Sequence, residues 1–111
     1  MEKIITFEEY TKVDLRIGTI IQVHDFPEAR NPAYQLVIDF GALGIKKSSA
    51  QITTVYSKRD LRGRQGVAVI NFPKKQIAKF MSACLVVCAV KVNVVFLLRP
   101  EDPVINGSPV A

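Results

Sequence analysis

Histidine, cysteine and acidic side chains are scarce in this sequence, and each scarcity excludes a class of function. His24 is the only histidine among 111 residues, so a Cys-His or Ser-His catalytic pair would have to use that one residue. No group of residues has the spacing of a metal site. One acidic residue lies between positions 41 and 91, which leaves no acid/base pair or magnesium site there. We therefore predict a protein that is not an enzyme, with no catalytic residue, no metal and no cofactor.

Long apolar segments are also missing. The most apolar run, Ala83 to Leu98, is interrupted by Lys91 and Asn93 and is rich in valine. It is too short and too β-branched for a membrane span. The first residues contain neither a long apolar region nor a small-residue cleavage site, so we expect no signal peptide. These absences favour a protein without membrane insertion, and the cytoplasm is the default location.

The two cysteines, Cys84 and Cys88, are too close in the sequence to be bridged if they share a strand. They would lie roughly 13 Å apart, at about 3.3 Å per residue, which is beyond the reach of a disulfide. The pair is more typical of buried thiols in a reducing compartment.

The net charge of +5 is unevenly distributed. Residues 1–40 carry a charge of −3, residues 41–91 carry ten basic side chains and one acidic one, and the remainder carries −1. Such a cationic segment attracts phosphates or acidic partners. The alternative is that its lysines only keep the protein soluble.

The stretch from Asp14 to His24 has the period-two pattern of one long first strand. Gly18 in its interior favours a bulge, a bend or a close backbone approach. A bent strand of this length can pair with one neighbour along its first half and another along its second, as in small five-stranded barrels. An ordinary meander strand with a neutral glycine is the alternative. The residues expected to share one face are Ile17, Thr19, Ile21 and Val23.

The remaining pattern predicts an all-β protein with short helices. Thr6 and Glu9 have the spacing of a capping box, and the short helix that follows would either plug the barrel or meet a second subunit. A second short helix is expected within residues 53–62, capped by Thr53 or Thr54. The other predicted strands are Tyr34–Phe40, Ile45–Ile52, Val67–Phe72 and Cys84–Val90, with Val94–Arg99 as a sixth strand or a continuation, and residues 74–82 form a basic connector. Three strands, a helix and two strands is the order of the OB-fold, a five-stranded Greek-key barrel, here as one domain over residues 1–111.

Polar and basic residues cluster on two of these segments. On an OB barrel both segments flank the face that such folds commonly use for nucleic acid. Lysines would bind phosphates, hydroxyls and amides would bind base edges or sugar hydroxyls, and Phe72 would either stack on a base or belong to the core. The candidate RNA-binding residues are Lys46, Lys47, Ser48, Ser49, Gln51, Asn71, Lys74, Lys75, Lys79 and Ser82.

Several motifs together resemble the CsaA family, small bacterial and archaeal proteins related to the tRNA-binding domain of some methionyl- and phenylalanyl-tRNA synthetases. The most specific are Pro-Glu-Ala-Arg at residues 27–30 and Ser-Ser-Ala-Gln-Ile-Thr at residues 48–53. Weaker matches are Asp14-Leu-Arg-Ile-Gly-Thr-Ile, Asn71-Phe-Pro, Lys75-Gln-Ile-Ala, Phe80-Met-Ser and Leu97-Leu-Arg-Pro. The sequence departs from the family pattern at Cys88, where a glycine is expected, and in Lys91-Val-Asn-Val, a turn that lacks a residue readily taking positive φ.

The resemblance implies a non-catalytic OB-fold homodimer assembled through its terminal segments. It implies a chaperone for protein export that binds unfolded secretory precursor polypeptides in a hydrophobic pocket near the dimer seam, and that carries a tRNA-binding surface. The family's RNA surface corresponds here to Ser48, Ser49, Gln51, Asn71, Lys75 and Ser82. The alternative is a tRNA-binding accessory protein of translation without chaperone activity.

Overall fold

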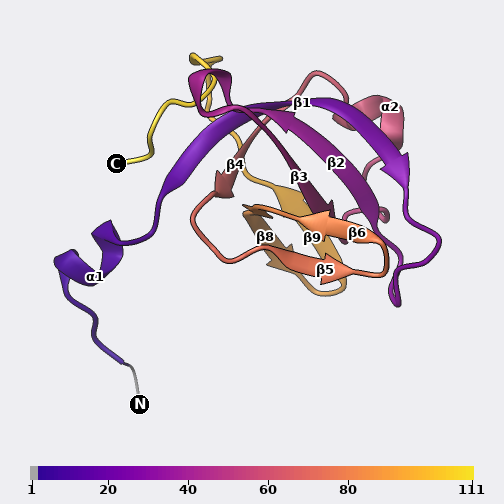
Figure 1. Cartoon of the computed structure of the whole chain (residues 1–111), viewed down its shortest axis with the longest axis horizontal. Coiled ribbons are helices and arrows are strands. Elements are labelled where there is room, and N and C mark those ends of the chain that lie inside the picture. The colour runs from indigo at the N-terminus through magenta and orange to yellow at the C-terminus, as the bar shows by residue number, and fades with distance from the viewer. Residues whose placement is uncertain (1–2) are drawn as a thin grey trace.

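The computed structural model describes residues 3–111 and is organised around one long strand, β1 (Leu15–Asp25). Figure 1 shows α1 projecting away from the curved strands that make up the body of the molecule. The other elements, in chain order, are α1 (Phe7–Thr11), β2 (Tyr34–Asp39), the 3-10 helix η1 (Gly41–Leu43), β3 (Ile45–Ala50), α2 (Lys58–Leu61), β4 (Gln65–Val69), β5 (Lys75–Ile77), β6 (Phe80–Ser82), β7 (Leu85–Val86), β8 (Cys88–Lys91) and β9 (Val94–Leu97).

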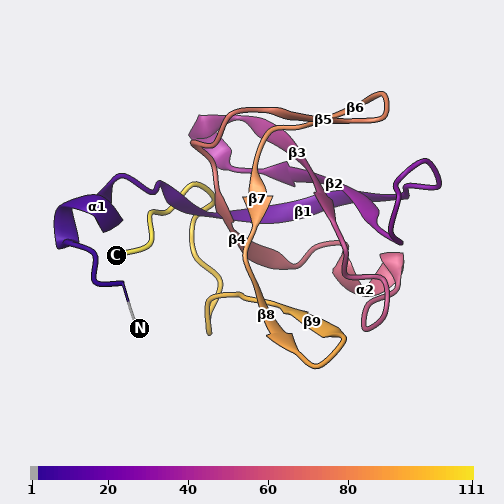
Figure 2. The same ribbon diagram turned by 90° about the horizontal axis from the view of Figure 1, so that it is seen from below.

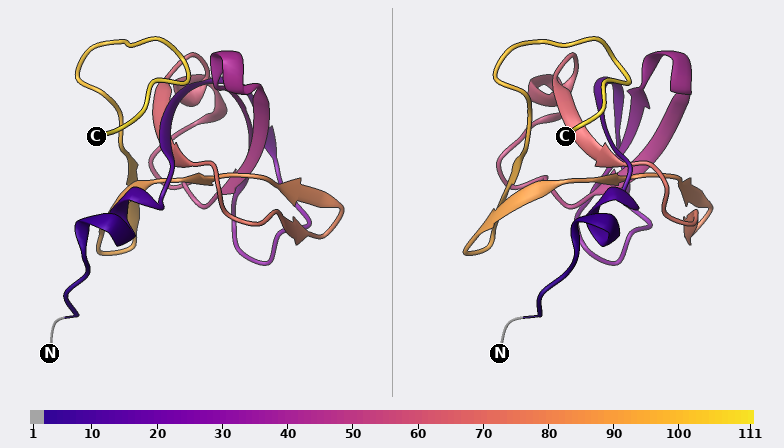
Figure 3. Two further views of the ribbon diagram at one scale, coloured as in Figure 1. Left: turned by 60° about the vertical axis from the view of Figure 1, so that its left-hand side comes forward. Right: turned by 90° about the vertical axis from the view of Figure 1, so that its left-hand side faces the viewer.

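Five strands form one antiparallel sheet in the order β3-β2-β1-β4-β7. The sheet curls until its two outer strands approach each other. The backbone N–H of Ala83, just before β7, donates to the backbone oxygen of Lys47 on β3 over 2.8 Å. The sheet is thus a nearly closed five-stranded barrel (Figure 3), which confirms the predicted OB-type architecture.

The strand β1 is shared between two neighbours, as its interior glycine predicted. Its residues from Leu15 to Thr19 pair with β4, and those from Thr19 to Asp25 pair with β2. Gly18 directly precedes Thr19, the residue at which the two pairings meet, and a Cβ atom on Gly18 would be 2.6 Å from Cγ2 of Ile38 on β2. The absence of a side chain therefore permits the close approach of these strands. The alternative of an ordinary meander strand is wrong.

A register shift between Ile20 and Gln22 changes which residues of β1 face the barrel interior. Ile20 belongs to the buried core, and Val23, an odd number of residues further on, packs against that same core. The prediction that residues 17, 19, 21 and 23 share one face is therefore wrong. The extra residue of the bulge reverses the alternation along the second half of the strand.

The barrel interior is filled largely from β2, whose alternation is as predicted. Its inward-facing side chains, and that of the residue that follows it, are at most 8% exposed: Tyr34, Leu36, Ile38 and Phe40. Leu61 of α2 is completely buried in the same core. The helix begins later than predicted, because its cap is Ser57, whose hydroxyl accepts the N–H of Asp60, and not Thr53 or Thr54.

The helix α1 lies outside the barrel. Its predicted capping box is present, since Oγ1 of Thr6 accepts the N–H of Glu9 over 3.1 Å and the Glu9 carboxylate accepts the N–H of Thr6 over 3.0 Å. No residue of α1 is buried, and Phe7 is 79% exposed, so the helix does not plug the barrel. The C-terminal tail runs beside the first half of β1, where Val110 N–H donates to the oxygen of Leu15 over 3.0 Å.

The second half of the chain differs from the predicted strands. β4 ends at Val69 instead of Phe72, residues 74–82 contain the hairpin β5–β6, and the predicted fifth strand divides at Val87 into β7 and β8. β9 is a separate strand that pairs with β8, and Asn93 in their turn has a φ of 61°. Asparagine tolerates this left-handed conformation, so the expectation that the turn lacks a suitable residue is wrong.

Two further expectations concern side chains and membrane contact. Cys84 and Cys88 are both free, as their separation predicted. The first is buried and the second half-buried.

Within residues 3–111, none of the helices combines the length and the apolar character needed to cross a bilayer.

Candidate nucleic-acid interface

A groove of about 730 Å³ opens between β3, the segment after β4, the β5–β6 hairpin and β7. Figure 2 shows this hairpin lying alongside β3, with β7 running from it across the barrel. Four of the ten predicted RNA-binding residues line the groove: Ser49, Gln51, Lys75 and Ser82. The fold thus brings together residues from β3 and from the hairpin that are far apart in the sequence.

Ser82 holds one wall of the groove in place. Its hydroxyl accepts the backbone N–H of Ser49 on β3 over 3.3 Å and donates to the backbone oxygen of Cys84 over 3.3 Å. These bonds attach β6 to β3 outside the main sheet ladder. Ser82 therefore positions the hairpin as well as lining the groove.

The groove has an apolar floor beneath its polar residues. Ile52, Cys84 and Val86 are buried there, whereas Phe72 and Leu85 are each 50% exposed. Of the two roles considered for Phe72, stacking or core, the exposed position fits stacking. Leu85 was missed by sequence reasoning, because an exposed residue within an apolar run gives no signal of its own.

The electrostatic environment of the groove is positive. No carboxylate lines it among the described residues. Burial raises the pKa of the Cys84 thiol to about 11 and also raises the pKa of Cys88, so both thiols are uncharged at neutral pH. Within residues 3–111 the two ion pairs use Arg16 and Lys58, which leaves the lysines around the groove without a carboxylate partner. We call the five predicted RNA-binding lysines the groove lysines: Lys46 and Lys47 on β3, Lys74 just before β5, Lys75 on β5, which lines the groove, and Lys79 in the β5–β6 turn.

Ser48 is not available to a ligand. Its side chain is 0% exposed, and its hydroxyl donates to the backbone oxygen of Ser49 over 3.1 Å. Alternation along β3 explains this, because Ser48 and Ala50 face the core while Lys47, Ser49 and Gln51 face outward. This burial leaves the Ser48 side chain no exposed surface, and its predicted RNA contact stays an untested prediction.

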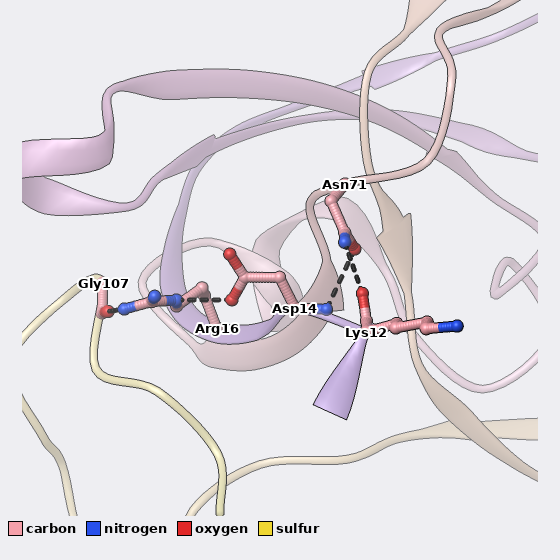
Figure 4. Close-up of polar contacts among 5 residues, drawn as sticks. All are labelled: Lys12, Asp14, Arg16, Asn71 and Gly107. Atoms are coloured by element: carbon pink, nitrogen blue, oxygen red, sulfur yellow. Dashed lines mark hydrogen bonds and ion pairs between the residues drawn. The ribbon is translucent and has the colours of Figure 1, made fainter. Parts of the chain in front are cut away.

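Asn71 holds the N-terminal segment and does not line the groove (Figure 4). Its side-chain oxygen accepts the backbone N–H of Asp14 over 2.9 Å, and its side-chain nitrogen donates to the backbone oxygen of Lys12 over 2.7 Å. Arg16 pairs with the Asp14 carboxylate over 2.7 Å and donates to the backbone oxygen of Gly107 over 3.0 Å. We call these five residues the terminal clamp. Asn71 thus has a structural role, and its predicted RNA contact stays an untested prediction.

We expect Asn71→Ala to loosen the link between α1 and β1 without unfolding the barrel. The change leaves two backbone groups without their partner, and each such bond contributes about 0.5–1.5 kcal/mol. Hydrogen exchange of the Asp14 amide, followed by NMR, should become about 3- to 10-fold faster because this segment opens locally. Asn71→Asp is the matched control, since its carboxylate still accepts the Asp14 N–H. Unchanged exchange at Asp14 in the alanine variant would contradict the role of the clamp.

Most of the chain matches a known protein family. Residues 15–109 match the family described as "Putative tRNA binding domain". The chain belongs to this family. A curated relative is the methionine–tRNA ligase of Pyrococcus furiosus, 33% identical over 106 residues. That match covers 96% of this chain and 14% of the ligase, so the chain spans about one seventh of the length of this relative.

Two solved structures resemble the tRNA-binding domain along nearly its whole length. The chaperone CsaA from Bacillus anthracis str. Ames is 47% identical with a TM-score of 0.93, and the match covers 98% of this chain and 100% of the other. The CsaA chaperone protein from Picrophilus torridus is 46% identical with a TM-score of 0.92, over 97% of this chain and 100% of the other. These similarities confirm the predicted relation to CsaA proteins.

His24, the one histidine, lies on the exposed end of β1 and does not line the groove. Its Nε2 is 3.1 Å from the side-chain oxygen of Gln22. No group of three or more His, Cys, Asp or Glu side chains that would hold a metal occurs in the described part of the chain. The matched family is described as a tRNA-binding domain.

Proposed function

We propose that the groove binds tRNA in the cytoplasm and that the protein also acts as a chaperone for unfolded secretory precursors. The observation that carries the first activity is the groove itself, which Lys75 and exposed polar groups line in a domain of the tRNA-binding family. A phosphate backbone gains most from such a surface, because its binding releases condensed counterions.

Each group in the groove has a role that follows from its chemistry. Lys75 inside the groove and Lys74 beside it bind phosphates, which position the RNA without reading its sequence. Ser49 and Gln51 offer donors and acceptors to base edges or ribose hydroxyls. Phe72 presents an aromatic face on which an unpaired base stacks. The groove therefore suits the unpaired bases of a tRNA loop better than a duplex, whose bases are stacked inside the helix.

A specific observation favours the chaperone activity. The chain is 47% identical to a chaperone CsaA over 98% of its length. It also exposes large apolar side chains, including Phe72 and Leu85 in the groove at 50% each and Val92 at 85%. Such surfaces attract the apolar segments that an unfolded precursor leaves in water. The alternative function is that of a tRNA-binding accessory protein of translation, without peptide binding.

We further propose a homodimer assembled through the terminal segments. Figure 2 places α1 and the C-terminal end on the same side of the molecule. The exposed apolar side chains of the two terminal segments include Ile4 at 95%, Phe7 at 79% and Ile105 at 84%. A second copy of the chain, related by a two-fold axis, would cover this self-complementary patch.

The wild-type protein is expected to sediment at about twice the chain mass of 12.3 kDa, and Phe7→Glu at about the mass of one chain. The introduced carboxylate would lose its hydration in the interface without gaining a partner. Ile45→Glu is the control, because Ile45 is 62% exposed on β3, outside the terminal segments. Sedimentation equilibrium at micromolar concentration distinguishes the two masses, and a monomeric wild type would refute the dimer.

The proposed activities are tested together by an anisotropy titration of fluorescently labelled bulk tRNA, at low and at physiological salt. Binding at physiological salt with displacement by an unfolded precursor peptide supports both activities on overlapping surfaces. Binding without displacement, and without suppression of precursor aggregation, supports the accessory protein of translation. Binding confined to low salt would show that the charge provides only general attraction, and would overturn the tRNA site.

A further inference from the structure

The predicted RNA-binding residues account for half of the basic side chains in the middle of the chain. Residues 41–91 contain ten basic residues, of which five are the groove lysines and one is Lys91 in the β8–β9 hairpin. The other four lie in or next to α2, where Asp60 is the only acidic residue between positions 53 and 64. These four are Lys58, Arg59, Arg62 and Arg64. Neither the sequence pattern nor the groove assigns them a function.

Three of these basic side chains line a second concavity, which we call the α2 cleft. It has a volume of about 650 Å³ and lies between α2 and the end of β1. It shares no lining residue with the groove. Figure 1 shows α2 at the upper right and the β5–β6 hairpin at the lower right, so the two sites occupy different parts of the surface. The residues that line the α2 cleft are Gln22, Val23, His24, Lys58, Arg59 and Arg62.

The guanidinium groups of Arg59 and Arg62 are free to bind a ligand. Both side chains are exposed, and neither takes part in a hydrogen bond or an ion pair within residues 3–111. Their spacing of three residues places them on the same side of this helical turn. Lys58, by contrast, is bound to Asp25 over 2.7 Å, which raises the pKa of Lys58 and attaches α2 to β1.

The carboxylates nearest to the α2 cleft are already engaged. Asp25 is paired with Lys58, and Asp60 accepts the backbone N–H of Ser57 over 3.1 Å as part of the helix cap. Arg64 does not line the cleft, because its guanidinium lies 5.5 Å from the ring centre of Tyr56. The cleft therefore presents two guanidinium groups that form no ion pair, beside the polar side chains of Gln22 and His24.

We propose that the α2 cleft is a second contact site for the phosphodiester backbone of the RNA that occupies the groove. The planar fork of arginine binds phosphate oxygens in pairs, which a lysine ammonium does not. The proposal rests on the proposed tRNA-binding function and extends it. Because the two sites are separate, a folded tRNA spans both, while a short single strand placed in the groove reaches only one. Binding at the first site raises the effective concentration of the RNA at the second.

The test compares Arg59→Ala/Arg62→Ala with a control of equal charge, Lys91→Ala/Arg99→Ala, whose two side chains are exposed and lie outside both sites. Two probes are titrated by fluorescence anisotropy at several salt concentrations: bulk tRNA and a single-stranded RNA of about six nucleotides. For tRNA we expect the arginine variant to lose about tenfold in affinity, with a salt slope smaller by about 2. For the short RNA we expect no change. The control variant should bind both probes like the wild type.

Three results would overturn the second site. Equal losses in the arginine and control variants would assign the effect to net charge alone. Equal losses for tRNA and the short RNA would place the arginines at the groove. Unchanged tRNA binding by the arginine variant would exclude the α2 cleft from the RNA interface. If the wild-type protein fails to bind tRNA, the proposed function itself is refuted. If the wild type binds tRNA and the arginine variant binds it equally well, only the second site is refuted.

Discussion

Replacing Lys74 and Lys75 together by alanine is expected to weaken tRNA binding by roughly 10- to 100-fold at physiological salt, because each exposed contact with a phosphate contributes about 0.7 to 1.4 kcal/mol. Each lost phosphate contact also reduces the slope of log affinity against log salt by about 0.9. Both lysines are exposed, and neither side chain has a partner within residues 3–111, so stability should change by less than about 0.5 kcal/mol. Anisotropy titrations and thermal unfolding of the same samples measure both quantities.

The control for this experiment is Lys91→Ala/Arg99→Ala, which lowers the net charge by the same amount away from the groove. Its tRNA affinity should stay close to that of the wild type, since long-range attraction is largely screened at physiological salt. An equal loss in both variants would show that the groove has no special role. An unfolded Lys74→Ala/Lys75→Ala variant would instead contradict the absence of structural contacts at these side chains.

The elements that the sequence predicted well are those governed by local rules. Thr6 and Glu9 satisfy each other within one helical turn, so the capping box follows from their spacing alone. The alternation of β2 survives because that strand has no bulge and one of its faces is buried throughout. Gly18 indicated a bent first strand because few other reasons exist for a glycine inside a strand.

Features that depend on tertiary contacts were not predictable from the sequence. The bulge near Ile21 reverses the faces of β1, and no residue type in that stretch marks it. Ser48 and Ser49 are adjacent serines, but only the register of β3 decides that the first is buried and the second lines the groove. Asn71 was predicted to contact RNA because a side-chain amide can form hydrogen bonds with RNA and with protein backbone equally well.

The groove itself was predicted in part. The motif that contains Ser49 and Gln51 and the segment with Lys75 and Ser82 were assigned to one surface by analogy with the barrel topology, and the fold brings these four residues to one groove. The apolar floor and the α2 cleft were not predicted, because the side chains that form each of them come from segments that are separate in the sequence. Charge counted along the chain located the basic region but did not show that it divides into two sites.

Gly18→Ala is expected to destabilise the barrel by about 1–3 kcal/mol, the usual cost of overpacking a core. The added Cβ would lie 2.6 Å from Ile38 and 2.8 Å from Phe40, and both of those side chains are buried and have little room to move. For a domain of this size the midpoint of thermal unfolding should fall by about 4–8 °C for each kcal/mol. Circular dichroism during heating measures the shift.

Gly66→Ala is the matched control, because Gly66 on β4 pairs directly with Gly18 on β1. Both changes restrict the unfolded chain to the same extent, which by itself stabilises by about 0.4–1 kcal/mol. A Cβ on Gly66 would lie 3.4 Å from the Leu97 side chain, an ordinary contact. The difference in unfolding free energy between the two variants therefore isolates the contact of residue 18 with β2. Equal unfolding free energies of the two variants would mean that β1 and β2 move apart around the added Cβ without a loss of stability. In that case the close approach of these strands does not hold the barrel together.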